Sequence, residues 1–576
     1  MKFRWVLAPP QPSVVAELAS QVEVSALLAQ CLVNRGLGVP FRAASFLEPR
    51  LKSLSDPDRL PNLAAAVARL WQAREQSEPM VIFGDYDVDG VTASALLLQV
   101  LRPLGWQTSC YLPHRLDEGY GLTRDAVESC LQKHPVKLIL AVDCGSTALG
   151  TITWLRSCGV DVIVLDHHQV SSPPPPATAL VNPQLGPNTP EGLSDLCSAG
   201  LAFKLAHALV KEGRDRDVVA ANGFDLRPLL DLVALGTIAD LVPLRGENRI
   251  LVTTGLERLN TTARPGLQAL RAVAQINGPI GPYEVAFQLA PRLNAAGRLE
   301  NATEALDLLL ADDMVRAESI ATSLDARNRE RQNIERGIAD EVISAIRARF
   351  NPETDFMIVE GQMFWHVGVV GIVASRVLHE FHRPTIILGG DGHEWRGSGR
   401  SIEGFDLAAA LRECGDLLLR HGGHAMAAGL TLHPENVPAL RARLNTLARK
   451  SLTTEQLQPT LQLDAEVRLS ELTLDRLLEL ARLQPHGQGN PAVQVIVSGV
   501  TLRRPPLRMG REQQHLKLWI MDGDSVMEAV WWGGNGKPCP EGTFDLACTP
   551  QINEFNGRTV VQAKVLDWRP AALPHT

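Results

Sequence analysis

The chain has 576 residues, of which 45% are hydrophobic and 21% are charged, and its net charge is −8 at pH 7. This length exceeds what one hydrophobic core supports, so it predicts three or four domains of a soluble globular protein. No apolar run is long enough to cross a membrane. The nine cysteines are scattered without a Cys-x-x-Cys pair, so they indicate neither a zinc site nor a disulfide framework. Cysteines without a disulfide framework predict a reducing compartment, the cytoplasm.

The amino-terminal part of the chain leads into a first buried strand. Residues 1–79 contain helix-like segments broken by Pro and Gly, which predicts a helical region. The apolar run Val81–Gly84 then ends in Asp85-Tyr86-Asp87-Val88-Asp89-Gly90, and a helical period follows. Such an Asp-rich string is also found in ordinary turns and calcium loops. A calcium loop requires Glu at its twelfth position, which here is Leu96, so that alternative fails.

Two further apolar runs also end in carboxylates or imidazoles. Val136–Val142 is followed by Asp143-Cys144-Gly145, and Val160–Leu165 is followed by Asp166-His167-His168. A segment of helical period, Thr123–Gln132, precedes the first of these runs. Short apolar strands that alternate with helices predict an α/β domain with a parallel sheet, to which we assign residues 80–266.

The carboxyl ends of parallel strands lie on one edge of a sheet, where ligands bind. This edge is expected to collect seven side chains, the last from the apolar stretch 231–243: Asp85, Asp87, Asp89, Asp143, Asp166, His167 and Asp240. Two carboxylates about 4 Å apart repel by roughly 4 kcal/mol at an effective dielectric of about 20. Two divalent ions would balance such a cluster, so the pattern predicts a two-metal site for phosphoester hydrolysis. An imidazole among the ligands favours Mn²⁺ over Mg²⁺.

The remainder of the chain predicts three more regions. A helical connector, 267–350, contains one long helix, Glu318–Phe350, whose middle is polar on every face, as in helices that bridge domains. A second α/β lobe covers 351–455. Residues 456–576 carry five strand-like runs, which fit an oligonucleotide-binding (OB-like) β-barrel: Val493–Val500, His515–Ile520, Val526–Trp532, Phe544–Thr549 and Thr559–Val565.

The negative net charge does not exclude nucleic acid, because a channel needs only a local basic lining. Four loops mix Arg with residues whose amides or side chains bind phosphate: 112–121, 291–298, 374–376 and 397–401. The alternative is Arg on a solvated surface. In the barrel region, basic residues accompany tryptophans, which predicts a face that stacks the bases of a single strand: Arg503, Arg504, Arg508, Arg511, Lys517, Trp519, Trp531 and Trp532. Trp531 and Trp532 would equally suit an ordinary barrel core.

Five motifs together resemble the DHH phosphoesterase family, which is named after the triplet at Asp166-His167-His168. Asp85–Gly90 resembles its first motif, Asp143-Cys144-Gly145 its second, and Gly236–Asp240 its fourth. Gly422–Gly429 resembles the Gly-Gly-His signature of the associated DHHA1 substrate domain. In size and domain order the chain is most similar to the family's bacterial exonucleases, which degrade single-stranded DNA from 5′ to 3′ and yield mononucleotides.

The resemblance implies a role for each motif residue. It implies catalytic metal ligands at Asp87, Asp89, Asp143, His167 and Asp240, with Asp85 as a further ligand. Asp166 would orient His167 from behind, and His168 would contact the phosphate or hold the fold. The implied substrate contacts are Arg115, Arg292, Arg298, Ser375, Arg376, Arg400, Ser401, Gly422, Gly423 and His424. The cofactors would be two Mn²⁺ or Mg²⁺ ions.

The resemblance also implies single-stranded DNA as partner, together with a single-strand-binding protein and a RecQ-type helicase in recombination and repair. The protein is expected to act as a monomer without a membrane. Three alternatives stay open: a DHH phosphodiesterase for short oligonucleotides or dinucleotides, a catalytically idle replication scaffold, and an adaptor that uses only the barrel. One departure from the family is His486 within Gln484–Pro491, where relatives often have an aromatic residue.

Overall fold

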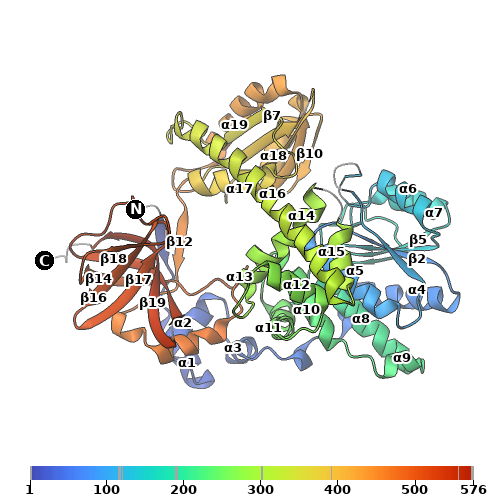
Figure 1. The fold of residues 1–576 in the computed structure, drawn as a ribbon, viewed down its shortest axis with the longest axis horizontal. Helices are drawn as coiled ribbons and strands as arrows, with labels where there is room; N and C mark the ends of the chain where they lie inside the picture. Colours follow the sequence, from blue (N-terminus) through green and yellow to red (C-terminus); the bar gives the residue numbers. More distant parts are fainter. Residues whose placement is uncertain are drawn as a thin grey trace. The chain divides into compact units, whose positions relative to one another are not determined.

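A computed structural model describes residues 3–114, 118–119, 121–186, 189, 192–299, 302–390, 392–555 and 557–571 (Figure 1). The chain divides into two compact units. Unit 1 comprises Met1–Ala43, Arg331–Arg482 and Ala492–Thr576, and unit 2 comprises Ala44–Glu330 and Leu483–Pro491. The region 1–79 therefore contributes to both units, and it contains a strand, β1 (Arg4–Leu7), besides its helices α1 (Pro12–Val22), α2 (Ala26–Asn34), α3 (Pro40–Leu47) and α4 (Leu63–Glu75).

Unit 2 contains the predicted parallel sheet. Its five strands lie in the order β3-β2-β4-β5-β6, and every neighbouring pair is parallel. All residues of β2 and β4 are buried, because helices cover both faces of the sheet. The strands span Met80–Gly84 (β2), Thr108–Tyr111 (β3), Leu138–Val142 (β4), Asp161–Leu165 (β5) and Ala179–Val181 (β6).

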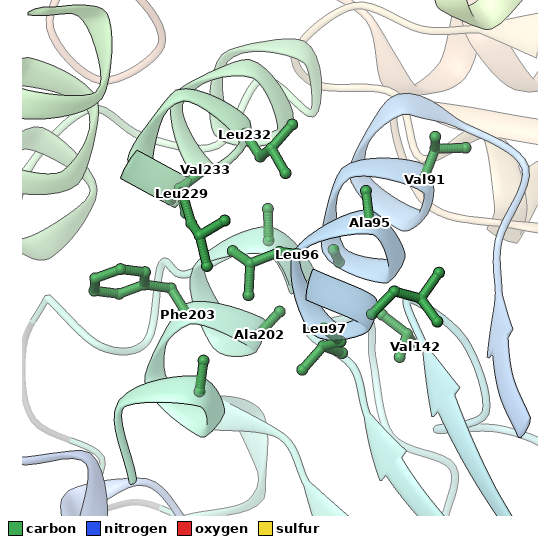
Figure 2. Close-up of a cluster of buried hydrophobic side chains, with 14 of the residues drawn as sticks. Val91, Ala95, Leu96, Leu97, Val142, Ala202, Phe203, Leu229, Leu232 and Val233 are labelled. Atoms are coloured by element: carbon green, nitrogen blue, oxygen red, sulfur yellow. The ribbon is translucent and has the colours of Figure 1, made fainter. Parts of the chain in front are cut away.

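Successive residues of the strands point to opposite faces and enter two separate cores. Helices α6 (Arg124–Lys133) and α7 (Leu149–Ser157) pack on one face. Helices α4, α5 (Val88–Leu101) and α8 (Ser198–Asp215) pack on the other face. Helix α10 (Leu230–Ala239) packs against α5 and α8 through the buried side chains shown in Figure 2, which include Leu96, Ala202, Phe203, Leu232 and Val233.

Helices dominate the rest of unit 2. They include α9 (Val219–Asn222), α11 (Gly246–Asn260), α12 (Pro265–Val273), α14 (Ala290–Leu299) and α15 (Thr303–Leu310). The long helix predicted at Glu318–Phe350 is present as α16 (Met314–Arg347), whose 34 residues span about 50 Å. Its residues up to Glu330 belong to unit 2 and those from Arg331 belong to unit 1. Its polar middle is less exposed than its composition suggests, because Asp325, Asn328, Arg331 and Glu335 are all buried.

The second α/β lobe, in unit 1, contains a mixed sheet of order β10-β11-β9-β8-β7. Only β7 and β8 pair in parallel; the other pairs are antiparallel. Helices α17, α18 and α19 pack on it around apolar side chains. The elements span Ile358–Met363 (β7), Val370–Phe381 (α17), Thr385–Gly390 (β8), Trp395–Arg400 (β9), Leu407–Glu413 (α18), Arg420–Gly423 (β10), Ala427–Leu432 (β11) and Val437–Ser451 (α19).

The carboxy-terminal region forms the predicted five-stranded barrel. The ring closes through the pairs β14–β18, β18–β19, β19–β17, β17–β16 and β16–β14. Short strands flank it, namely β13 (Ala465–Glu466), β15 (Leu507–Met509) and β12 (Thr460–Leu463), which pairs with β1. The five ring strands span Val495–Leu502 (β14), His515–Asp522 (β16), Ser525–Trp531 (β17), Phe544–Phe555 (β18) and Arg558–Pro570 (β19).

The barrel tryptophans differ in their environment. Trp531 is buried, as the core alternative predicts, whereas Trp532 is 50% exposed. The Arg504 guanidinium lies 3.3 Å from the ring centre of Trp519, and the Lys517 ammonium lies 5.5 Å from it. Basic side chains therefore lie against Trp519 of β16, and Trp532, the residue after β17, adds an exposed aromatic ring.

The nine cysteines, all in the described part of the chain, are free thiols. Among the described residues no single helix is both long and apolar enough to cross a membrane; α1 and α2 pass that test only jointly, with a 113° bend between them.

Candidate metal centre

Three neighbouring strands deliver the acidic residues to one edge of the sheet. The amide of Asp85 donates to the Val142 carbonyl (3.2 Å), and that of Asp143 donates to the Leu165 carbonyl (3.0 Å). The amide of Asp166 donates to Val181 in the same way (3.1 Å). Each acid therefore continues the hydrogen-bond ladder by one residue, which fixes it at the carboxyl end of its strand.

The loops after these strands adopt conformations that few residues tolerate. Asp143 has φ +63°, a left-handed conformation that Asp adopts more readily than most residues do. A Cβ on Gly90 would lie 2.6 Å from the Asp85 carbonyl oxygen, so the Asp85–Gly90 turn requires glycine there. Asp87 caps α5, because its carboxylate accepts from the amides of Asp89 (2.9 Å) and Gly90 (3.2 Å).

Helix α10 brings the fourth acidic segment to this edge. A Cβ on Gly236 would lie 2.4 Å from the Thr92 hydroxyl and 3.0 Å from Asp89 Oδ1, so only glycine allows α10 to approach so closely. Asp240 then lies at the C-terminal end of α10, followed by Leu241 at φ +60°. Close packing thus requires glycine at position 236, and the helix then brings Asp240 to the same edge of the sheet.

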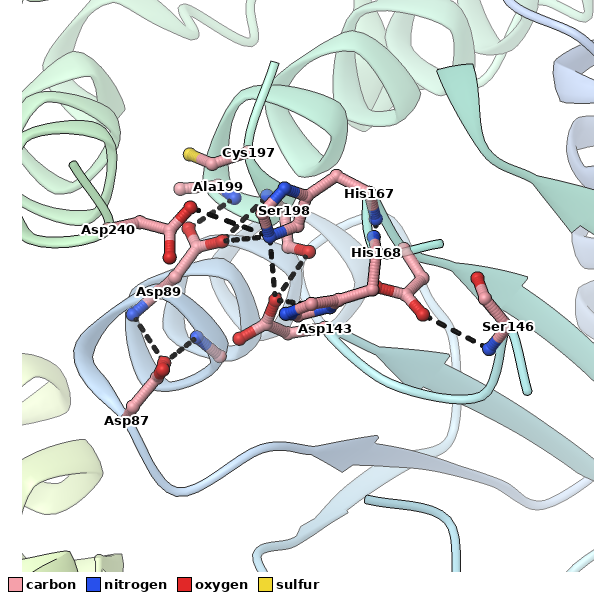
Figure 3. A network of polar contacts seen from close by, with 12 residues as sticks. Asp87, Asp89, Asp143, Ser146, His167, His168, Cys197, Ser198, Ala199 and Asp240 are labelled. Carbon is pink, nitrogen blue, oxygen red and sulfur yellow. Dashed lines mark hydrogen bonds and ion pairs between the residues drawn. The ribbon is translucent and has the colours of Figure 1, made fainter. Parts of the chain in front are cut away.

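His167 lies at the middle of the cluster (Figure 3). Its Nε2 is 3.5 Å from Asp143 Oδ1, 3.5 Å from Asp240 Oδ2 and 3.8 Å from Asp89 Oδ2. This nitrogen is buried and makes no hydrogen bond within the described part of the chain. A buried nitrogen that faces three carboxylates beyond hydrogen-bonding distance fits a divalent cation bound between them.

The possible ligand atoms form three overlapping groups, each within 4.8 Å: Asp85, Asp87 and Asp143; Asp89, His167 and Asp240; Asp143, His167 and His168. Asp143 and His167 each belong to two of these groups, so together they connect the Asp85 and Asp87 group to the Asp89 and Asp240 group. All the metal ligands that the sequence predicts are therefore brought together within unit 2.

The N-terminus of α8 supports the cluster, and no sequence motif indicated it. The amides of Ser198 and Ala199 donate to the Asp89 carboxylate (2.7 and 2.8 Å), where the helix dipole favours negative charge. The Ser198 hydroxyl donates to Asp143 Oδ1 (2.9 Å). The only available signal was a serine that opens a helical run, which usually means an ordinary cap.

The Asp166 carboxylate contacts the imidazole of His168 rather than that of His167, from which it accepts only the backbone amide (2.8 Å). Asp166 Oδ1 lies 2.7 Å from His168 Nδ1, and Oδ2 accepts from the Ser146 amide (3.0 Å). Burial opposes ionisation of Asp166, but these hydrogen bonds lower its pKa. Burial likewise disfavours the His168 cation, but Asp166 outweighs it and raises the pKa of His168 to about 9.

The cluster is electrostatically unstable without cations. Burial, reinforced by neighbouring carboxylates, raises the pKa of Asp89 and Asp143. The same causes raise the pKa of Asp240 to about 9. Burial lowers the pKa of His167, which keeps the imidazole neutral and able to bind a metal.

These shifts predict opposite pH dependences for stability and metal affinity. Because the folded-state pKa of Asp240 is above its unfolded value, the metal-free fold holds extra protons, and its stability should fall as pH rises from about 5 to about 8. Mn²⁺ must displace these protons, so its affinity should rise over the same range. Thermal unfolding with and without Mn²⁺, and calorimetry in two buffers to count released protons, test both trends. Mn²⁺ binding without proton release would contradict them.

The predicted substrate contacts lie in both units. In unit 2, Arg292 pairs with Asp325 (2.9 Å) and donates to the Gln288 carbonyl. Arg115 and the side chain of Arg298 lie outside the described residues. In unit 1, the Arg376 guanidinium pairs with buried Glu335 (2.8 Å), and the Ser375 hydroxyl donates to the Gly371 carbonyl.

Backbone pairing brings the other candidates of unit 1 together. Arg400 pairs with Ala427 in the β9–β11 register, and the Ser401 amide donates to the Met426 carbonyl (2.9 Å). The Arg400 guanidinium donates to the Ser398 hydroxyl and the Gly399 carbonyl. Gly422, Gly423 and His424 are exposed at the β10–β11 turn, whereas the Ser401 side chain is buried and donates to Phe405.

A parallel sheet whose strands end in this carboxylate and histidine cluster defines a DHH-type phosphoesterase. Family models match the chain as the DHH family N-terminal domain over residues 79–237, the DHHA1 domain over 354–450 and the RecJ OB domain over 463–567. The single-stranded-DNA-specific exonuclease RecJ of Bacillus subtilis is 38% identical over 98% of this chain and 71% of its own length. The chain therefore belongs to the RecJ family.

Solved structures of the family agree in fold. RecJ from Thermus thermophilus in complex with Mn²⁺ has a TM-score of 0.84 and 32% identity, covering 99% of this chain and 80% of that one. The same protein in complex with Mg²⁺ has a TM-score of 0.78 and 29% identity, covering 99% and 79%.

Proposed function

We propose that this chain is a metal-dependent exonuclease that hydrolyses single-stranded DNA from the 5′ end to mononucleotides, in recombination and repair. The observation that carries the proposal is the buried cluster around His167, in which every ligand expected of the family is present. An idle scaffold would have no reason to retain it. Membership of the RecJ family supports single-stranded DNA as the substrate, since the relatives are single-stranded-DNA-specific exonucleases.

We assign Asp85, Asp87, Asp89, Asp143, His167 and Asp240 as ligands of two Mn²⁺ or Mg²⁺ ions, the metals held by the Thermus relative. When bound, such ions supply the Lewis acidity for phosphodiester hydrolysis. The chain's own residues hold the geometry: the α8 amides fix Asp89, and the Ser198 hydroxyl fixes Asp143. Asp166 orients the His168 imidazole, which we assign to the substrate phosphate.

We propose that Arg292, Arg298 and Arg115 of unit 2 bind phosphates of the single-stranded DNA. Residues of the DHHA1 domain, in unit 1, would bind further phosphates. These residues of unit 1 are Ser375, Arg376, Arg400, Ser401, Gly422, Gly423 and His424. The surface around Trp519 and Trp532 would stack bases of the strand. A single-strand-binding protein and a RecQ-type helicase are proposed partners, the compartment is the cytoplasm, and the chain acts as a monomer.

Arg400→Ala should raise KM for a single-stranded oligonucleotide about 10- to 100-fold, because a hydrogen bond to a charged phosphate contributes about 1.5–3 kcal/mol. The rate constant kcat and the bound Mn²⁺ should change little. Arg396→Ala is a matched control, since Arg396 lies on the same strand and is exposed. Steady-state kinetics of both variants would measure KM and kcat. Unchanged values in Arg400→Ala would leave Arg400 only the structural role of holding Ser398 and Gly399.

Digestion of three end-labelled DNAs with Mn²⁺ tests the proposed function. The substrates are one strand labelled at 5′, the same strand labelled at 3′, and a blunt duplex. We expect immediate release of the 5′ label as mononucleotide, gradual shortening of the 3′-labelled strand, and resistance of the duplex. Hydrolysis of a dinucleotide with long DNA untouched would instead favour the small-substrate phosphodiesterase.

A further inference from the structure

A short segment before the barrel belongs to the unit that contains the metal centre. Residues Leu483–Pro491, which we call the strap, are part of unit 2, whereas the residues on both sides of them belong to unit 1. Residues 492–494 connect the strap to β14 of the barrel. It contains the Gln-Pro-His-Gly-Gln-Gly-Asn-Pro sequence, to which neither the ligands nor the substrate contacts assign a role.

The strap contacts the loop that follows Asp240. The Gln488 carbonyl accepts from the amide of buried Leu244 (2.7 Å). A Cβ on Gly487 would lie 2.7 Å from Leu244 Cδ1, and one on Gly489 would lie 3.0 Å from Pro243 Cβ. Gly489 also has φ +70°. A side chain at Gly487 would therefore displace Leu244, and one at Gly489 would crowd Pro243 and adopt a strained backbone conformation.

Buried polar groups hold the strap rigid. The Arg249 guanidinium, from α11, donates to the carbonyls of Leu483 (2.9 Å) and Gln484 (2.7 Å), and its Nε donates to Phe46 (2.7 Å). Asn490 is fully buried, and its Nδ2 donates to the carbonyls of Leu483 (2.7 Å) and Pro485 (2.9 Å). Removal of either side chain would leave buried carbonyls with fewer donors, which is costly.

One more buried side chain connects this loop to the other side of the metal centre. Asn248 Nδ2 donates to the carbonyls of Pro243 (3.1 Å) and Asp195 (2.6 Å). Asp195 lies three residues before Ser198, whose amide and hydroxyl hold Asp89 and Asp143. Hydrogen bonds therefore join the strap to the segments that position Asp240 on one side and Asp89 and Asp143 on the other.

We propose that the strap is a positioning segment of the metal centre, which holds Asp240 and the start of α8 at the separations that ion binding requires. The proposal rests on the assignment of Asp89, Asp143 and Asp240 as ligands. The segment that precedes the barrel would thereby help to set the affinity of the centre for metal. Residues in the layer behind metal ligands commonly change affinity by about 10- to 100-fold when replaced.

Asn490→Ala in the full chain tests this proposal. We expect about tenfold weaker Mn²⁺ binding, measured by electron paramagnetic resonance of free Mn²⁺, with the cleavage rate largely restored by excess Mn²⁺. The matched control is Asn445→Ala, because Asn445 also bonds to several backbone groups but lies in the second lobe. Unchanged Mn²⁺ affinity in folded Asn490→Ala, or an equal loss in Asn445→Ala, would overturn the proposal.

A second pair of variants covers the case in which Asn490→Ala does not fold. Gly489 and Gly499 are both exposed and have similar φ angles, +70° and +68°, but a Cβ on Gly499 would meet nothing within 4 Å. Gly489→Ala should therefore weaken Mn²⁺ binding, whereas Gly499→Ala should not; equal affinities would overturn the proposal. Wild-type protein that binds Mn²⁺ but leaves single-stranded DNA intact would contradict the proposed function. It would not contradict the proposal for the strap, because that proposal is tested by Mn²⁺ affinity.

Discussion

Replacement of Asp143 by asparagine should abolish cleavage while leaving the fold and single-strand binding intact. Asp143 groups with Asp85 and Asp87, and its Oδ1 also lies 3.5 Å from His167 Nε2, which groups with Asp89 and Asp240, so loss of its charge affects both proposed ions. The metal contribution to phosphoryl transfer amounts to several kcal/mol, which corresponds to a fall in kcat of at least about 10³-fold. Asparagine tolerates the φ of +63° at this position and can still accept from Ser198.

Single-turnover kinetics with a 5′-labelled strand would measure this loss, and fluorescence anisotropy would measure binding of the strand. Asp231→Asn is the matched control: Asp231 is a buried aspartate of the same domain, but it pairs with Arg264 away from the cluster. The control should lose stability without losing cleavage by the folded protein. Full activity of Asp143→Asn would remove the basis of the two-metal assignment.

His167→Ala should have the second largest effect. Its Nε2 faces Asp89, Asp143 and Asp240, so alanine removes the one neutral ligand among the carboxylates. Since residues behind a ligand already contribute about 10- to 100-fold, loss of a direct ligand should reduce the rate by at least about 100-fold. Mn²⁺ binding should weaken more than Mg²⁺ binding, because Mg²⁺ prefers oxygen ligands.

Titration of activity with each ion would reveal this difference in preference. His134→Ala, at the end of α6, is the control, and it should leave both titrations unchanged. A uniform loss with Mn²⁺ and Mg²⁺ in His167→Ala would mean that the imidazole shapes the site without binding metal.

The sequence predicted the architecture because local patterns determine most of it. The runs around Val81, Ile139 and Val162 are apolar on both faces, and only a buried parallel strand accommodates that pattern. The barrel strands alternate, and each predicted run begins within about two residues of an observed strand. The last two strands, β18 and β19, extend further than predicted, to Phe555 and Pro570. The pairing of β1 with β12 was not predictable, because it joins short segments more than 450 residues apart.

The convergence of the acidic residues could also be predicted from the sequence, because the carboxyl ends of parallel strands lie on one edge of the sheet. Two features depended on tertiary packing and left no clear pattern. Ser198 resembles an ordinary helix start, and only its approach to Asp89 and Asp143 gives it a role. The buried state of Asp325 and Glu335 likewise follows from their partners Arg292 and Arg376, which lie on other helices.

Anomalous diffraction from crystals grown with Mn²⁺ would test the two-metal centre most directly. Two peaks about 3.5–4 Å apart are expected, one beside Asp85 and Asp87 and the other beside Asp89 and Asp240, with Asp143 between them. A single peak, or peaks away from His167, in a preparation that still degrades single-stranded DNA would contradict the two-metal assignment.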